Sequence, residues 1–256
     1  MTPVLAFDIE TVPDVAGIRR LHDLPADLPD REVAEVAFRR RRTQTGSDFL
    51  PPQLQRVVVI SCVMRGDDGV KVFSLDGSEP EMIQRFYDGI EKYIPQIVSW
   101  NGGGFDLPVL NYRALMHGVS APMFWETGDE NRDFRYNNYV SRYHARHTDL
   151  MDVLAMYQPR NNAPLDEVAQ LSGLPGKIGV GGAKVWETYL AGEIGKIRDY
   201  CEADTANTYL LYLRYQLLRG VFTKDHFKKE TQLLRTYLKD LDKLHWREFL
   251  KLWNEA

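Results

Sequence analysis

Four acidic residues and a tyrosine in this chain have the types and spacing of a metal-dependent hydrolytic site. Asp8 and Glu10 end an apolar run that begins at Val4, and the period of two in a strand would place both carboxylates on one face. Two converging carboxylates repel each other unless a cation lies between them, and oxygen-rich clusters suit Mg²⁺ or Mn²⁺ better than Zn²⁺. The alternative is an ordinary strand end that leads into a solvated loop.

Asp106 lies where a second apolar run, 97–100, gives way to a helical pattern at 107–117, and it closes the motif Asn101-Gly-Gly-Gly-Phe105-Asp106. A plain helix N-cap would explain Asp106 without any catalysis. It does not explain three consecutive glycines, which allow backbone or substrate to approach closely at the end of a strand.

Tyr200 and Asp204 are four residues apart in a segment, 197–213, that contains neither Gly nor Pro and suits one long helix. Positions i and i+4 share a face one turn apart, so a phenol and a metal-bound carboxylate there can address the same water. The alternative is that Tyr200 packs in a core and Asp204 faces solvent.

The order D-x-E, N-x-x-x-F-D and Y-x-x-x-D resembles the tyrosine subgroup of the DEDD superfamily of 3′-5′ exonucleases. Within it, the chain looks like the stand-alone bacterial proteins related to the proofreading exonuclease domain of family B DNA polymerases. The stretches 147–152 and 181–187 add to this resemblance, which covers residues 3–215.

The resemblance implies a two-ion mechanism that releases nucleoside 5′-monophosphates one at a time from a 3′ end. In it Asp8 bridges two Mg²⁺ or Mn²⁺ ions, and Tyr200 orients the attacking water. The implied metal ligands are Asp8, Glu10, Asp106 and Asp204, and the implied contacts of the terminal nucleotide are Asn101 and Phe105.

A rival third motif exists, because His144 and Asp149 fit the H-x-x-x-x-D pattern of the histidine subgroup. Asp149 follows Asp106 too closely to leave room for the strand and helices expected before the third motif. It also lies in a strand-like sequence, whereas that motif belongs on a helix. We therefore expect Asp149 and Asp152 to shape the end of a strand or to cap the element that follows.

The elements that must position these residues alternate in a way typical of an α/β protein. The resemblance implies a ribonuclease H-like fold, with a mixed five-stranded sheet flanked by helices. Strands are expected at 4–7, 56–64, 70–75, 97–100 and 147–150, and helices at 80–93, 107–117, 164–172 and 194–218. A long insertion at 11–53 with a helix at 32–42 separates the first two strands. The glycine-rich segment 173–182 lacks the spacing of a phosphate-binding loop and is expected to be a loop near the substrate.

We expect an exonuclease domain at 1–218 and a helical extension at 219–256. The extension has apolar residues at helical spacing, as one or two amphipathic helices would. Packing against the domain is its expected role, and a homodimer or partner contact is the alternative.

Composition is that of a globular protein: 256 residues, 44% hydrophobic, formal charge −4. No signal peptide and no apolar run long enough to span a bilayer is present, which predicts a cytoplasmic protein without membrane contact. Cys62 and Cys201 form no paired motif and are expected to be buried small residues rather than zinc ligands or a disulfide.

An acidic protein that acts on nucleic acid must concentrate its positive charge locally. One basic cluster is Arg39 to Arg42, which suits a solvated helix face as well as a binding site. A second is interleaved with aromatic residues as in a single-strand track, or it is a loop that folds its rings back onto the domain. Its predicted contact residues are Arg135, Tyr136, Tyr139 and Arg142.

The expected substrate is the 3′ end of single-stranded nucleic acid, with DNA favoured over RNA. DNA and RNA differ in the 2′-hydroxyl, and no short sequence motif shows whether a site accepts or excludes this group. The alternative function is a nucleic-acid-binding or scaffold protein that has the same fold without catalysis.

Overall fold

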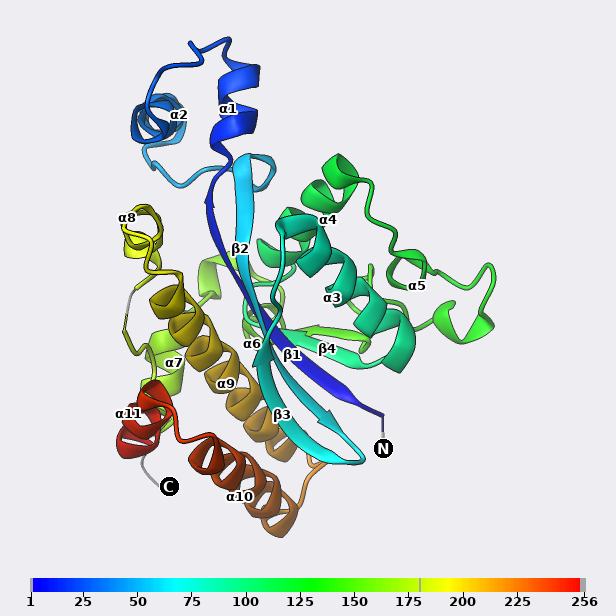
Figure 1. Ribbon diagram of the computed structural model, residues 1–256. Helices are drawn as coiled ribbons and strands as arrows, with labels where there is room; N and C mark the ends of the chain where they lie inside the picture. Colours follow the sequence, from blue (N-terminus) through cyan, green and yellow to red (C-terminus); the bar gives the residue numbers. More distant parts are fainter. Residues whose placement is uncertain (1, 180, 254–256) are drawn as a thin grey trace.

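The computed structural model describes residues 2–179 and 181–253, and a five-stranded sheet forms its centre (Figure 1). The strands are β1 (Val4–Pro13), β2 (Gln55–Gly66), β3 (Gly69–Ser74), β4 (Gln96–Ser99) and β5 (His147–Asp149), in the spatial order β3-β2-β1-β4-β5. The pairs β1–β2 and β2–β3 are antiparallel, whereas β1–β4 and β4–β5 are parallel. The five strands and the mixed sheet expected from the sequence are therefore confirmed.

Alternating side chains of β1 belong to two different cores. Leu5, Phe7 and Ile9 lie in a cluster with the apolar residues of α3 (Glu79–Tyr93) and α4 (Asp106–His117). Val4 and Ala6 lie in a cluster with α9 (Ile194–Leu218) on the opposite face of the sheet. Asp8 and Glu10 continue this second series, so the strand period directs both carboxylates toward α9.

Helices cover both faces of the sheet (Figure 1). The shorter ones are α5 (Pro122–Trp125), α6 (Leu150–Leu154), α7 (Leu165–Leu171) and α8 (Val185–Leu190). The helix expected at 194–218 has those bounds, and every residue from Tyr200 to Leu213 is buried. This burial on all sides arises because α9 lies between the sheet and α10 (Lys224–Leu241), which contacts both α9 and β3.

The insertion between β1 and β2 is a helical hairpin of α1 (Val15–Leu21) and α2 (Asp30–Thr45). The expected helix at 32–42 is confirmed within α2, but α1 was not expected. Ile18, Val33 and Leu50 form a small core within the hairpin. The insertion begins later than Thr11, because β1 continues to Pro13, which pairs with Gln55. The amide of Asp14 extends this ladder by donating to the carbonyl of Leu54 at 2.8 Å.

The C-terminal segment forms two helices, α10 and α11 (Leu244–Leu252), that pack against α9. Leu238, Trp246 and Phe249 are buried in the same cluster as the core of α9. The apolar stripe seen in the sequence is thus used within the chain, and a homodimer contact would have to use exposed residues such as Leu244. Among the described residues, no helix is long and apolar enough to cross a membrane.

Candidate active site

Three elements bring the five predicted catalytic residues to the same place in the structure. β1 supplies Asp8 and Glu10, the first turn of α4 supplies Asp106, and α9 supplies Tyr200 and Asp204. The carboxylates of Asp106 and Asp204 both act electrostatically on those of β1. A hydrogen bond from the amide of Ile9 to Oδ1 of Asp106, at 3.2 Å, joins α4 directly to the acidic strand.

A β-bulge lies at the end of the acidic pair. The β1–β2 register shifts between Glu10 and Thr11, so that Glu10 is opposite Val59 and Thr11 is opposite Val57. Bulges bend a strand and redirect its side chains, and they recur beside active sites. The extra residue, Val58, lies on β2, so β2 is the bulged strand, directly opposite the acidic end of β1.

Asp8 and Glu10 both have pKa values raised well above the usual range. The first cause is burial, which disfavours the charged form, and the second is repulsion by neighbouring carboxylates. The nearby Lys177 partly opposes this by lowering the pKa of Glu10. In the absence of a bound cation, the pair thus holds protons that isolated carboxyl groups would release.

Burial raises the pKa of Asp106 to about 7 and that of Asp204 to about 6. A hydrogen bond from the Tyr200 hydroxyl to Asp204 favours the ionised carboxylate and limits the second shift. Burial, and then the charge of Asp204, raise the pKa of Tyr200, so this phenol keeps its proton at neutral pH. Tyr200 is therefore a hydrogen-bond donor in the site rather than a phenolate.

Two further residues contribute to the site without having been predicted to do so. Cys201 is buried, as expected, but its Sγ lies 3.4 Å from Oδ2 of Asp8, and the ligand atoms of Asp8, Glu10 and Cys201 all lie within 4.8 Å of one another. Lys177 lowers the pKa values of Glu10 and Asp204. Both residues could have been found from their position in the sequence, because Cys201 adjoins Tyr200 and Lys177 lies in the glycine-rich loop expected near the substrate.

The glycine-rich loop before Asp106 is held by Asp149, which ends β5. The two carboxylate oxygens of Asp149 accept hydrogen bonds from the amides of Asn101 and Gly103, each at 2.9 Å. A Cβ atom on Gly102 would lie 2.3 Å from Oγ of Ser99, so the loop needs glycine there for close packing. Asp149 thus shapes a strand end, as we expected, and it fixes the loop that leads to Asp106.

The rival third motif lies apart from α9, although the charge of Asp149 contributes to the raised pKa of Asp106. His144 lies in the loop before β5, where its Nδ1 accepts a hydrogen bond from the amide of Asn138 at 3.0 Å. Asp149 caps α6 through the amide of Asp152 in addition to holding the glycine loop. Both residues have structural partners away from Tyr200 and Asp204.

The second basic cluster, residues 132–146, was predicted to contact a single strand. For Tyr139 this prediction is wrong. Its side chain is only 1% exposed, and its hydroxyl donates to the carbonyl of Pro95 at 2.7 Å. The guanidinium of Arg146 lies 3.8 Å from the centre of the Phe134 ring, which is also buried. The interleaved rings and arginines are thus largely each other's partners, which corresponds to a loop folded back onto the domain.

The other three predicted contacts in this segment differ in their surroundings. Arg142 forms an ion pair with Asp152 at 2.6 Å. Arg135 and Tyr136 are exposed, Tyr136 to 83%. Arg142 is exposed as well, so all three side chains lie outside the buried aromatic cluster and are accessible to a ligand.

The predicted contacts of the terminal nucleotide, Asn101 and Phe105, lie on either side of the glycines and are half-buried. Asn101 has a positive φ of 67°. Phe105 lines a groove of about 700 Å³ that also includes Glu10 of the carboxylate cluster. The structure thus brings Phe105 to a cavity that reaches the acidic residues.

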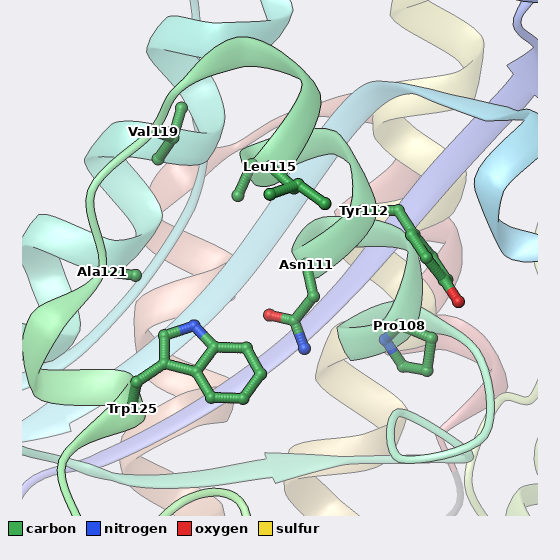
Figure 2. A pocket seen from close by; sticks show the side chains of 8 residues that line it. Pro108, Asn111, Tyr112, Leu115, Val119, Ala121 and Trp125 are labelled. Carbon is green, nitrogen blue, oxygen red and sulfur yellow. The ribbon is translucent and has the colours of Figure 1, made fainter.

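A second pocket, of about 550 Å³, lies on the outer side of α4 (Figure 2). Figure 2 shows Tyr112 and Leu115 of α4 around it with Trp125. Among the described residues that line it, none is a predicted catalytic residue. Of the predicted catalytic residues, Glu10 lines the first groove, and none lines this apolar pocket.

Comparison with known proteins gives results that agree with this geometry. Residues 47–253 match a family model described as "Predicted 3′-5′ exonuclease related to the exonuclease domain of PolB". A DNA polymerase of Archaeoglobus fulgidus is 28% identical over 189 residues, which are 72% of this chain and 23% of the polymerase.

A solved structure is also similar, that of the family B DNA polymerase of Pyrobaculum calidifontis. It has a TM-score of 0.51 and 22% identity, and the match covers 85% of this chain and 25% of the polymerase chain. The chain therefore spans about a quarter of the length of the polymerases that it matches. This chain and the similar polymerase domain share the ribonuclease H-like fold, which the family resemblance had implied.

Proposed function

The chain belongs to the family of 3′-5′ exonucleases related to the exonuclease domain of PolB, and from this we propose that it removes nucleotides from the 3′ end of single-stranded DNA with the help of two divalent cations. The observation that supports this proposal most strongly is the meeting of Asp8, Glu10, Asp106 and Asp204 beside Tyr200. The products would be nucleoside 5′-monophosphates.

The residues of the cluster fit divalent cations. Oδ1 of Asp204 is buried and, within the described part of the chain, accepts no hydrogen bond from any protein group. Buried oxygens rarely lack a partner, and hard cations such as Mg²⁺ and Mn²⁺ favour carboxylate oxygens. Burial first, and then repulsion between carboxylates, raise the pKa values of Asp8 and Glu10, and a bound cation would stabilise their ionised forms.

In the proposed mechanism Glu10 and Asp204 would help to hold one ion, Asp106 would help to hold a second, and Asp8 would contribute to both. When bound, the ions would supply Lewis acidity that activates water and stabilises charge on a leaving oxygen. The Tyr200 hydroxyl donates its proton to Asp204, and its oxygen would accept a hydrogen bond from the attacking water and so orient it. Burial of the cluster excludes other water, which strengthens each of these electrostatic contacts.

DNA is proposed as the substrate because the similar proteins are named DNA polymerases. A time course with Mn²⁺ and 5′-labelled single strands of DNA and RNA with one sequence tests this. The expected result is a ladder that shortens from the 3′ end and forms faster on DNA.

Faster shortening of the RNA strand would contradict the proposed preference for DNA but would still support 3′-5′ exonuclease activity. Absence of cleavage on both strands, with Mg²⁺ as well as Mn²⁺, would contradict the proposal and favour a binding protein with the same fold.

Tyr200→Phe should lower the turnover number by about 10-fold to 100-fold, because it removes a hydroxyl that positions water but no metal ligand. Steady-state kinetics on a short DNA strand measures this. Stabilisation of the protein by Mn²⁺ should be unchanged, which distinguishes lost positioning from a lost ion. A loss of that stabilisation would show instead that the phenol is needed to keep Asp204 in place.

A further inference from the structure

The groove that contains Glu10 is formed in large part by the insertion between β1 and β2. Its lining includes residues of α2 and of the loop after it, Phe105 before α4, and the first turn of α8. In Figure 1 the α1–α2 hairpin lies beyond the ends of β1 and β2, near α8. An ion pair between Arg31 of α2 and Glu187 of α8 joins the two sides. The insertion is therefore a wall of the cavity that begins at the catalytic carboxylates.

Phe49 is the most unusual residue of this wall. Its side chain is 59% exposed, although it is large and apolar. Its ring centre lies 5.1 Å from that of Phe105, the residue next to Asp106. The loop that carries it is held by Arg41, whose Nε donates to the carbonyl of Phe49 at 3.2 Å. The result is an aromatic surface that is fixed in place, open to solvent and adjacent to the acidic site.

Arginines lie beside the carboxylates of the groove other than Glu10. The three remaining carboxylates of the lining are each paired with an arginine: Glu35 with Arg39, Asp48 with Arg42 and Glu187 with Arg31. α2 has two more arginines, Arg40 and Arg41, and two more carboxylates, Asp30 and Glu32, so arginines and carboxylates are equal in number across α2, the loop after it and Glu187. The wall therefore offers individual guanidinium groups to a phosphate rather than a net positive charge.

Arg42 is the arginine that lines the groove itself. Its pair with Asp48, at 3.0 Å, is half-exposed on both sides. Exposed pairs of this kind contribute little, at most about 1 kcal/mol, so a phosphate oxygen can take the place of Asp48 at small cost. Aromatic rings and guanidinium groups that alternate along a groove are the usual means of holding a single strand without sequence preference.

We propose that the insertion is a substrate-binding element: Phe49 stacks on a base next to the 3′-terminal nucleotide, and Arg42 binds a phosphate of the same strand. This inference rests on the proposed function, because it assigns the strand's path to the site where that strand would be cut. It places the single strand between α2 and α8 rather than along residues 132–146.

The first test is binding of a 5′-fluorescein-labelled oligothymidylate by anisotropy, in metal-free buffer so that no cleavage occurs. Phe49→Ala should weaken binding by about tenfold, and Phe49→Trp should restore it, because any flat ring can stack on a base. Arg42→Ala should weaken binding less and lower the slope of log affinity against log salt by about one. Tyr93→Ala is the matched control, since Tyr93 is a half-exposed ring on α3 outside the groove.

The second test compares a single strand with thymidine 5′-(4-nitrophenyl phosphate), which has no neighbouring nucleotide. For Phe49→Ala we expect kcat/KM on the strand to fall about tenfold and on the small ester to stay unchanged. Equal strand binding and turnover by wild type and Phe49→Ala, at equal Tm, would overturn the inference. So would a loss that Tyr136→Ala produces and Phe49→Ala does not.

The proposed function fails in a different way, if wild type cuts neither the strand nor the ester. The binding measurement still decides the path of the strand in that case, because it needs no catalysis. The two failures are therefore distinguishable.

Discussion

Asp204→Asn should lower the rate of 3′-terminal cleavage by at least about a thousandfold, because it removes one of four carboxylates that converge on a single cluster. Asparagine has nearly the same shape but no charge. The buried Oδ1 that has no partner among the described residues would become an amide atom with far lower affinity for a cation. The loss should therefore appear in turnover far more than in KM for the strand.

Asp199→Asn is the matched control for this substitution. Asp199 lies on the same helix, is half-exposed and pairs with His245 at 3.2 Å, so the same chemical change is made outside the carboxylate cluster. Its rate should stay within about twofold of wild type. Circular dichroism and Tm must show that both variants fold. Near-normal cleavage by folded Asp204→Asn would remove the third motif from the site and with it the proposed mechanism.

Divalent cations should stabilise the protein strongly at about pH 8 and weakly at about pH 5. Asp8, Glu10, Asp106 and Asp204 all have raised pKa values in the folded state, that of Asp106 reaching about 7. Between about pH 4 and pH 7 these four groups thus bind more protons in the folded state than in the unfolded state. Their contribution to the unfolding free energy of the metal-free protein therefore falls as pH rises through this window.

A bound cation reverses that loss, because it binds the ionised carboxylates and competes with protons for them. With saturating Mn²⁺ we expect Tm to rise by at least about 5 °C near pH 8 and by less than about 1 °C near pH 5. Differential scanning fluorimetry with and without EDTA measures both values.

Asp106→Asn provides the control for the pH effect. In the metal-free state near pH 8 this variant should melt at a higher temperature than wild type, because a buried charge has been removed. Its response to Mn²⁺ should be smaller. An equal Mn²⁺ shift at both pH values would mean that the ion binds elsewhere, through groups that do not titrate in this range.

The strands and helices that carry the predicted site could be predicted well from the sequence, because the patterns that indicate them are local and periodic. The strand period at Val4 to Glu10 and the uninterrupted helix around Tyr200 placed both motifs on the correct elements. β1 was nonetheless expected to end at Phe7. Its continuation to Pro13 depends on pairing with β2, and an acidic strand end looks like a loop in a single sequence.

The errors and omissions lie where contacts between residues distant in sequence determine the structure. Tyr139 has the composition of a binding ring, but contacts with Pro95 and Phe124, which are distant in sequence, bury it. Cys201 looked like an ordinary buried residue, and only the approach of α9 to β1 brings its thiol to Asp8. No periodicity in the sequence encodes such tertiary contacts. Phe49 belongs to the same class, since its contact with Phe105 links the insertion to the glycine loop.

The α1–α2 hairpin enters and leaves the sheet at neighbouring points, which makes it a separable module for protein engineering. Asp14 and Leu54 are the last partners of the ladder, joined by a hydrogen bond of 2.8 Å. A two-residue Asn-Gly turn between them would close β1 and β2 into a tight hairpin without a change of register. Asp14 would remain to pair with Arg113. The same junction would accept the hairpin as a graft in other proteins of this fold, a route to transplanting its strand-contacting surface.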